Sequence, residues 1–274
     1  GTAGLEAACT AAEVGCNTFL LEKSNELGGL ASLISKIPAK NRLADFPHYL
    51  MHRAEQLDNL YNFKNTEGTP ENIRKFHPNI IVSSTGSAPL LPPIAGLKDR
   101  IDNENHNIYS ILGMISHIND FPKDLEGKKV VVVGGGAVGL DVVEFFADRN
   151  ADISIVEMMD QIGRDLDPVS KNDTKTMMKK HNVHQLTKTA LLEVKDSSFL
   201  VRGDGEPYEL PFEYGFVCLG MRAQGQLYQN LTEEFSSEDV EIMNIGDSQR
   251  ARRIIDGTQE GRNILTVLEQ KGYL

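Results

Sequence analysis

Residues 130–146 have a hydrophobic pattern that predicts a buried strand followed directly by a helix. Four consecutive β-branched residues, Val130 to Val133, favour a strand that is covered on both faces of its sheet. Three glycines follow, and apolar residues then recur at helical spacing from Leu140 to Asp148. A strand, a glycine turn and a helix in this order form the building unit of doubly wound α/β folds.

The same pattern occurs a second time, 135 positions earlier in the chain. Gly1, Gly4 and Glu22 correspond to Gly136, Gly139 and Glu157, and the interval from the last glycine to the acid is 18 residues in both copies. A later glycine, Gly28, corresponds to Gly163. This internal repeat predicts two similar units. The first unit lacks an opening strand and a first glycine before Gly1, so we expect the sequence to be part of a longer protein.

The rest of the pattern predicts further strands and helices in both halves. Residues 214–220 repeat the strand and glycine ending of residues 81–86 at an offset of 134. The other expected elements are a helix over 43–60, a helix start at 65–70, a short helix over 111–118, a helix over 170–181, strands over 191–201 and 208–212 around a turn, and a strand over 240–245 followed by a helical tail.

Together these elements predict an α/β protein with two Rossmann-like, three-layer dinucleotide-binding domains. Because Leu90 to Ile94 contains two prolines, it should leave the sheet as an extended crossing segment. This segment makes a natural domain boundary.

The glycines of the intact copy have the spacing of a phosphate-binding turn. Gly134 would make the tight turn, Gly136 would let a pyrophosphate approach the backbone, and Gly139 would let the helix pack closely on the strand. Glu157 ends the next apolar run, where an acid accepts hydrogen bonds from the adenosine ribose. Because a carboxylate repels a 2′-phosphate, NAD(H) is favoured over NADP(H). The alternative is a glycine turn in an ordinary α/β core.

Composition and charge narrow the possible partners. The net charge of -11 argues against nucleic acid or an anionic membrane as the main partner. No apolar stretch is long enough to span a bilayer, and the three cysteines form no C-x-x-C, so a cytoplasmic location fits best. The histidine pairs at 48 and 52 and at 181 and 184 lack further ligands nearby, so no metal site is expected.

The order of these motifs resembles that of flavoproteins with two dinucleotide-binding domains. Besides the two fingerprints, the resemblance is carried by Leu27-Gly28-Gly29, Ser84-Thr85-Gly86, Val217-Cys218-Leu219-Gly220 and Ile245-Gly246-Asp247. The chain is most similar to the C-terminal half of the NADH:flavin oxidoreductases related to 2-enoate reductase and 2,4-dienoyl-CoA reductase. It departs from that family at Ala251, where a proline is usual, and at Gly257, where an alanine is usual.

The resemblance implies that the second domain is inserted in the first. The expected boundaries are 1–95 with 226–274 for the first domain, 96–126 for a polar connector, and 127–225 for the second domain.

The resemblance also implies two cofactors and assigns residues to each. FAD would be surrounded by Gly1, Gly4, Glu22, Gly28, Gly29, Thr85, Gly86, Gly246 and Asp247. NADH would be surrounded by Gly134, Gly136, Gly139, Glu157 and Gly220. Hydride would pass from the nicotinamide to the flavin. In the full-length family, an N-terminal (β/α)8 barrel carries FMN, an iron-sulfur cluster and the residues that reduce the substrate.

Three functions are therefore compared. The first is an oxidoreductase module that takes hydride from NADH onto FAD for a missing barrel domain, with no catalytic residues of its own. The second is a module that binds ADP or NAD without redox activity. The third, a disulfide reductase, requires a pair of redox thiols, whereas Cys9 and Cys16 lie seven residues apart and Cys218 falls in an apolar strand.

Overall fold

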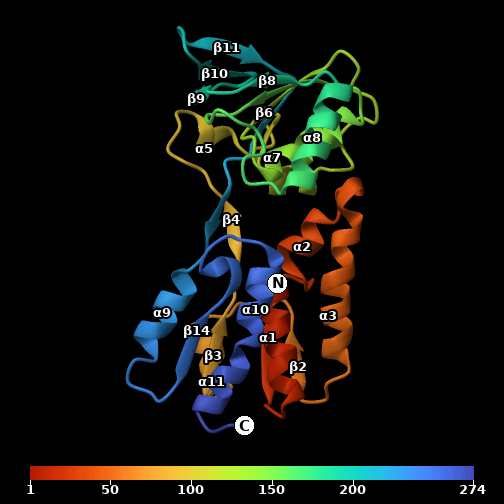
Figure 1. Cartoon of the computed structure of the whole chain (residues 1–274). Helices are drawn as coiled ribbons and strands as arrows, with labels where there is room; N and C mark the ends of the chain where they lie inside the picture. Colours follow the sequence, from red (N-terminus) through yellow and green to blue (C-terminus); the bar gives the residue numbers. More distant parts are fainter. The chain divides into compact units, whose positions relative to one another are not determined.

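The computed structural model describes all 274 residues, and the chain divides into two compact α/β units (Figure 1). Unit 1 comprises Gly1–Lys36, Lys40–Ala88 and Arg222–Leu274. Unit 2 comprises Pro89–Met221 together with Ile37–Ala39. The second unit thus interrupts the first, as the resemblance implies. The chain passes between them in the segments of β4 (Ser87–Pro89) and β13 (Met221–Ala223), which form a two-stranded sheet.

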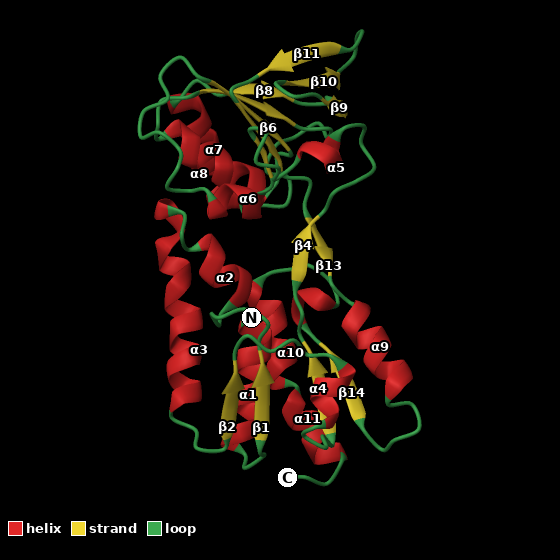
Figure 2. Cartoon of the chain, turned by 180° about the vertical axis from the view of Figure 1, so that it is seen from behind, coloured by secondary structure: helices red, strands yellow, loops and turns green.

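Unit 2 contains a parallel sheet, a separate antiparallel sheet and four helices (Figure 2). Its elements are α5 (Leu97–Arg100), β5 (Ile108–Tyr109), α6 (Ile111–Ser116), β6 (Lys129–Val133), α7 (Ala137–Ala147), β7 (Asp152–Val156), α8 (Pro168–Lys180), β8 (His184–Leu186), β9 (Ala190–Val194), β10 (Ser198–Arg202), β11 (Tyr208–Pro211) and β12 (Tyr214–Val217).

The parallel sheet has the order β5-β12-β6-β7-β8, with β6 at its centre. Residues 130–133 of β6 are all buried, as expected for a strand covered on both faces. The last residue of β6, Val133, pairs with Val156 of β7 and Val217 of β12. The C-terminal ends of these three strands therefore lie side by side at one edge of the sheet.

The antiparallel sheet β11-β10-β9 supplies the apolar layer on one side of the parallel sheet. Its Phe199 and Val201 are fully buried in one cluster with Val131 and Val133 of β6. The sequence predicts a single strand over 191–201, and that prediction is wrong. The segment forms β9 and β10, which pair with each other, because both strands bury apolar residues against the same core.

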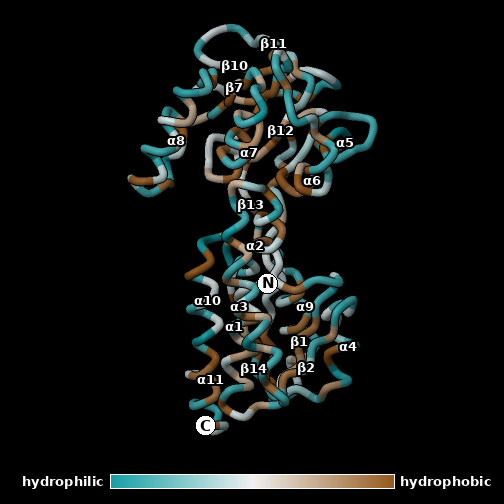
Figure 3. The backbone as a smooth tube through the Cα atoms, turned by 90° about the vertical axis from the view of Figure 1, so that its right-hand side faces the viewer, coloured by the Kyte–Doolittle hydropathy of each residue, from teal (hydrophilic) through white to brown (hydrophobic).

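Residues 96–126 form part of unit 2, whereas the sequence suggests a connector. β5 pairs with β12, and the neighbouring residues Ile108, Met114 and Leu125 are buried. The short helix expected over 111–118 is present as α6, and its Ile111, Met114 and Ile115 are buried at helical spacing. The burial of Ile108 and Leu125 follows no such pattern and becomes evident only in the folded unit. The outer helix α8 is hydrophilic along most of its length (Figure 3), as its sequence predicts.

Unit 1 contains helices around two pairs of parallel strands. Its elements, besides β4 and β13, are α1 (Thr2–Glu13), β1 (Thr18–Leu21), α2 (Gly29–Ile34), the 3-10 helix η1 (Pro38–Ala44, shared with unit 2), α3 (Asp45–Glu55), β2 (Leu60–Phe63), α4 (Pro70–Arg74), β3 (Ile80–Ser83), α9 (Gln226–Glu234), β14 (Glu241–Asn244), the 3-10 helix η2 (Gly246–Ser248), α10 (Ile254–Arg262) and α11 (Ile264–Gln270).

The two strand pairs of unit 1, β1-β2 and β14-β3, correspond to the two flanks of the unit 2 sheet. The repeat aligns β1 with β7 and β3 with β12, and in unit 2 the strand β6 lies between those two. No strand of unit 1 pairs with both β1 and β3. The inner edges of β1 and β3 therefore have no ladder partner among the residues of this chain.

The helical segment of unit 1 is shorter than the sequence predicts. α3 begins at Asp45 and ends at Glu55, so the prediction of a helix over 43–60 is wrong at its C-terminal end. Leu60 opens β2, which pairs in parallel with β1, and it packs with Ala8 and Cys9 of α1. Leu57 and Leu60 continue the helical spacing after Glu55, but Leu60 belongs to the strand β2, and both residues pack in the cluster with α1.

No helix of the chain combines the length and the apolar character that a membrane span requires.

Candidate nucleotide-binding sites

In unit 2 the residues of the glycine fingerprint lie at the edge where β6, β7 and β12 end. Gly134 has a φ of 108°, which L side chains rarely adopt, and a Cβ added there would lie 2.1 Å from the carbonyl oxygen of Cys218. A Cβ on Gly139 would lie 1.9 Å from the carbonyl oxygen of Gly134. Both positions therefore accept only glycine, for the two reasons given by the sequence: a tight turn and a close approach of α7.

Gly136 has a different environment, because no atom lies within 4 Å of the position that its Cβ would take. Its backbone has φ of -80° and ψ of -179°, which any residue can adopt. The fold itself therefore does not require glycine at this position. The open space beside the backbone fits the role expected for Gly136, which is to let a pyrophosphate approach.

The first turn of α7 is free of side-chain caps. Gly136 is its N-cap residue and no side chain accepts a hydrogen bond from the first amides. By contrast, α6 and α8 of the same unit are capped by Ser110 and Asp167. Uncapped amides at a helix N-terminus are donors for an anion, and the helix dipole favours negative charge there. The residues present thus fit a dinucleotide phosphate.

Glu157 follows β7, and backbone amides hold its carboxylate. One oxygen accepts a hydrogen bond from the Gly135 amide and the other from the Met159 amide, both at 2.7 Å. Gly135 is tied in turn to Gly163, whose amide donates to the Gly135 carbonyl at 2.7 Å. The fingerprint spacing assigns no role to Gly135. Its only signal is that it lies inside a run of three glycines.

Gly220 completes the residues proposed for this site. It follows β12 with a φ of 101° and has no atom within 4 Å of a Cβ position. Its carbonyl accepts a hydrogen bond from the Leu90 amide at 2.9 Å. The structure therefore places Gly134, Glu157 and Gly220 after three neighbouring strands of one sheet.

In unit 1, three separate segments converge on the first turn of α1. A Cβ on Gly29 would lie 2.8 Å from Gly1 Cα, and one on Gly4 would lie 2.4 Å from Ser84 Oγ. A Cβ on Gly246 would lie 2.8 Å from the Cβ of Ala3. The motifs around residues 28, 85 and 246 therefore surround the start of α1. Like α7, α1 has no side-chain cap.

Glu22 and Asp247 keep part of their hydrogen-bonding capacity. One Glu22 oxygen accepts the Ser24 amide at 2.9 Å and the Ser24 hydroxyl at 3.0 Å. Asp247 accepts the Ser87 hydroxyl at 2.9 Å on one oxygen and the Arg252 amide at 3.0 Å on the other. A carboxylate offers about four acceptor sites, so both side chains can also accept ligand hydroxyls.

The loop with Thr85 and Gly86 is tied to the returning chain. The Thr85 hydroxyl donates to the Gln224 carbonyl, and the Gln224 amide donates to the Gly86 carbonyl at 2.9 Å. Gly28 and Gly86 both have positive φ, of 102° and 76°. These bonds fix the loop at the C-terminal end of β3, next to α1 through Ser84.

An ionic network around the buried Glu6 and the partly buried Arg53 holds α1 in position. Glu6 is only 4% exposed, and one of its oxygens accepts Arg53 Nη1 at 2.9 Å and Arg262 Nε at 2.8 Å. Arg53 also makes two hydrogen bonds to Glu13, at 2.5 and 2.6 Å. Burial raises the pKa of Glu6, but the hydrogen bonds from Arg262 and Arg53 outweigh it and hold that pKa below its ordinary value. The network joins α1 to α3 and α10.

Close backbone contacts also pack α10 against α1. A Cβ on Gly261 would lie 2.7 Å from the Ala3 carbonyl oxygen, and one on Gly257 would lie 3.3 Å from the Ala3 Cβ. Gly257, which departs from the family pattern, is thus at a position where the two helices approach closely.

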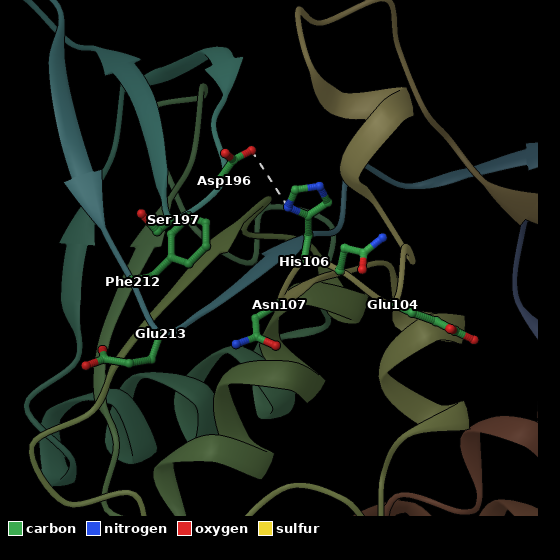
Figure 4. A pocket seen from close by; sticks show the side chains of 8 residues that line it. Glu104, His106, Asn107, Asp196, Ser197, Phe212 and Glu213 are labelled. Carbon is green, nitrogen blue, oxygen red and sulfur yellow. Dashed lines mark ion pairs between the residues drawn. The ribbon is translucent and has the colours of Figure 1, made fainter.

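A separate polar pocket of about 370 Å³ lies in unit 2 (Figure 4). His106 and Asp196 face each other across it, with 3.7 Å between His106 Nδ1 and an Asp196 oxygen. The same carboxylate accepts Arg100 Nε at 2.7 Å, which holds the pKa of Asp196 below its ordinary value. Glu213 at the rim accepts the Lys129 amide. None of the nucleotide residues lines this pocket.

The cysteines have the properties of inert thiols. Burial raises the pKa of Cys9 to about 11 and that of Cys218, which lies just after β12, to about 12. Burial also raises the pKa of the half-buried Cys16. A redox thiol needs a lowered pKa, so none of the three is activated. No group of three or more His, Cys, Asp or Glu side chains is arranged to hold a metal.

The chain belongs to the family of pyridine nucleotide-disulphide oxidoreductases, which matches residues 1–243. This membership confirms the resemblance to flavoproteins with two dinucleotide-binding domains. The family implies a redox role with a flavin and a nicotinamide nucleotide.

Characterised relatives cover nearly the whole chain. An NADH oxidase of Thermoanaerobacter brockii is 27% identical over 95% of this chain and 39% of its own length. A cinnamate reductase of Clostridium sporogenes is 23% identical over 93% of this chain and 36% of its own length. The solved structure of a 2-naphthoyl-CoA reductase has a TM-score of 0.82 and 23% identity over 96% of this chain and 38% of that one. The chain thus spans about two fifths of the length of these relatives.

Proposed function

We propose that the chain is an oxidoreductase module that passes hydride from NADH, bound at unit 2, to FAD, bound at unit 1. When both are bound, the nicotinamide supplies the hydride and the flavin accepts it. The protein's own residues bind and orient the two nucleotides. The observation that carries the proposal is the repeated site: in both units a helix without a side-chain cap starts at a glycine, and an acid follows the next strand.

The unit 2 site is proposed to hold NADH. Supporting this assignment, Gly136 leaves space beside the uncapped start of α7 for the pyrophosphate, and Glu157 lies after β7 with acceptor capacity for a ribose. The carboxylate is fixed by two amides, so it would meet the ribose hydroxyls without rearranging. A 2′-phosphate would place negative charge beside it, which favours NADH over NADPH.

The unit 1 site is proposed to hold FAD, with the start of α1 facing the pyrophosphate. Gly28, Gly29 and Gly86 would give backbone access, and Glu22 and Asp247 would accept hydroxyls of the nucleotide. We further propose that a strand from a longer polypeptide fills the position between β1 and β3. The place of β6 in the equivalent sheet of unit 2 supports this.

The full-length protein is proposed to be a reductase of the enoate or dienoyl type, in which this module feeds electrons to a barrel domain. That domain would carry FMN and an iron-sulfur cluster. The relatives support a larger protein, because the chain spans only 39% and 36% of the two named enzymes. The names of these two enzymes indicate different electron acceptors. The part that both share with this chain therefore fits a step that they would have in common, which is the input of electrons from NADH.

A second candidate function is nucleotide binding without redox activity. The observation that favours it is the incomplete sheet of unit 1, in which β1 and β3 have no shared neighbour. Unpaired backbone groups at these edges weaken the support of the phosphate site at α1. In that case unit 1 would bind only ADP, or nothing.

Calorimetric titrations with FAD, ADP and NADH, each alone, distinguish the two functions. The proposal expects one NADH and one FAD per chain, and FAD bound more tightly than ADP, because only FAD carries the flavin. Binding of ADP as tight as that of FAD, or absence of FAD binding, would favour the second candidate. Absence of NADH binding would refute the assignment of unit 2.

A further inference from the structure

The polar pocket of unit 2 is formed by three loops that are far apart in the sequence. They are residues 104–107 before β5, 196–197 between β9 and β10, and 212–213 before β12. The Glu213 amide donates to the carbonyl of Lys129, the first residue of β6, at 2.9 Å. The pocket therefore lies where β5, β6 and β12 begin, whereas the glycine fingerprint follows the other end of β6.

Hydrogen bonds and core packing give this pocket a defined wall. The Phe212 amide donates to the Ser197 carbonyl at 3.0 Å, and the His106 amide donates to the Asn103 carbonyl at 2.9 Å. Phe212 is buried, and its ring packs against Phe199 with 4.5 Å between the centroids. The pocket volume of about 370 Å³ falls in the range of about 300–1,000 Å³ that is typical of small-molecule sites.

The charged side chains that line the pocket are acidic. Glu104, Asp196 and Glu213 contribute carboxylates, and the lining includes neither lysine nor arginine. Arg100, which does not line the pocket, bonds to Asp196 at 2.7 Å and offsets one of these charges. A concave surface lined by one sign of charge focuses its electric field and concentrates ions of the opposite sign. A ligand of this pocket is therefore expected to be a cation.

The donor and acceptor groups favour an organic cation over a metal ion. No three His, Cys, Asp or Glu side chains are arranged to hold a metal. Figure 4 shows Asp196 and His106 pointing toward each other, whereas Glu104 points away from them. The 3.7 Å between His106 Nδ1 and the Asp196 oxygen exceeds a hydrogen bond, so Asp196 keeps acceptor capacity beyond its bond to Arg100. An ammonium group is a donor that can use this capacity, and an aromatic wall such as Phe212 attracts cations.

We propose that this pocket binds a small organic cation that carries a primary ammonium group. Asp196 would accept its hydrogen bonds, and the Phe212 ring would contact its methylene chain. Glu104 and Glu213 would attract it by their charge. This site goes beyond the proposed function, because no residue assigned to NADH or FAD lines the pocket. Binding of the cation and binding of NADH should therefore be independent.

Calorimetric titration with putrescine, which has an ammonium group at each end of a methylene chain, tests the proposal at low ionic strength. The dissociation constant should lie below about 1 mM. The uncharged analogue 1,4-butanediol should not bind, and NADH should leave the affinity for putrescine unchanged. Absence of saturable putrescine binding, equal binding of the diol, or competition by NADH would each overturn the proposal.

Two variants should change the affinity in opposite directions. Asp196→Asn should weaken putrescine binding about tenfold or more, because the ligand loses a charge-assisted hydrogen bond. Arg100→Gln should strengthen it about two- to fivefold, because the cation that competes for Asp196 is removed. A general loss of folded protein cannot produce both results. Weaker or unchanged binding by Arg100→Gln would overturn the assignment of Asp196.

Asp204→Asn is the matched control. It removes the same charge from an exposed position of unit 2, between β10 and β11, and Asp204 does not line the pocket. This variant should bind putrescine like the wild type. If Asp204→Asn and Asp196→Asn lose the same affinity, putrescine is attracted by the acidic chain as a whole, and the site is refuted.

Discussion

Replacing Gly136 by alanine separates the needs of the fold from those of the ligand. The residue has φ and ψ of -80° and -179°, and no atom lies within 4 Å of the new Cβ. Loss of glycine at a helix N-cap costs up to about 1 kcal/mol. Alanine also lowers the conformational entropy of the unfolded chain, which stabilises the folded state by about 0.4–1 kcal/mol. We therefore expect the free energy of unfolding to change by less than about 1 kcal/mol.

The same methyl group should greatly weaken NADH binding. It would occupy the space through which a pyrophosphate approaches the start of α7. Loss of one hydrogen bond to a charged group costs about 1.5–3 kcal/mol. The expected increase in the dissociation constant is therefore about 10- to 150-fold.

Calorimetric titration with NADH and thermal unfolding measure the two effects on the same protein. Gly205→Ala is the matched control, because this glycine of unit 2 also has no atom within 4 Å of its Cβ position and lies between β10 and β11. It should bind NADH like the wild type. If Gly136→Ala also binds NADH with wild-type affinity and unfolds normally, the phosphate assignment at α7 is wrong.

Three further predictions concern Glu157, Glu6 and the thiols. Glu157→Ala should weaken NADH binding and raise the ratio of NADPH to NADH affinity, as measured by titration; an unchanged ratio would contradict the ribose assignment. Glu6→Gln should destabilise the chain by about 1.5–3 kcal/mol in urea unfolding near neutral pH. Because the pKa of Glu6 is lowered in the folded state, its contribution to the free energy of unfolding is full above the unfolded pKa of about 4.3 and is lost as the pH falls through the folded pKa. A difference in unfolding free energy between wild type and variant that stays the same at all pH values would refute the role of this network. Native Cys9 and Cys218 should react negligibly with iodoacetamide near neutral pH, and rapid labelling would show that their thiols are not buried.

The sequence predicted the fold because its signals are local. The valine run of β6, the glycine spacing after it and the acid at Glu157 lie within 30 residues, and the repeat shows the same order in unit 1. The two prolines after Leu90 mark a domain boundary, and the resemblance implies that one unit is inserted in the other. The strand, the glycine turn and the acid are recognised from residues close together in the sequence, and the second copy is recognised from the constant offset of 135 positions.

The parts that the sequence did not predict depend on contacts between distant residues. The approach of Gly29 to Gly1 and of Gly246 to Ala3 is a property of the folded chain, although each glycine was recognised as a candidate. The hydrogen bond from the Gly135 amide to the Glu157 carboxylate likewise joins residues that follow two different strands. The sequence pattern does not predict the strand β5, which forms by pairing with β12. It also does not predict the end of α3 at Glu55, because the residues that follow enter β2, which pairs with β1.

The central claim is that NADH at unit 2 reduces FAD at unit 1, and anaerobic mixing tests it most directly. The chain is loaded with one equivalent of FAD and mixed with one equivalent of NADH while both absorbances are followed. The account predicts that the visible flavin absorbance disappears together with an equal amount of NADH, and that Gly136→Ala slows this reaction at limiting NADH. FAD and NADH that both bind, with the flavin remaining oxidised, would contradict the account.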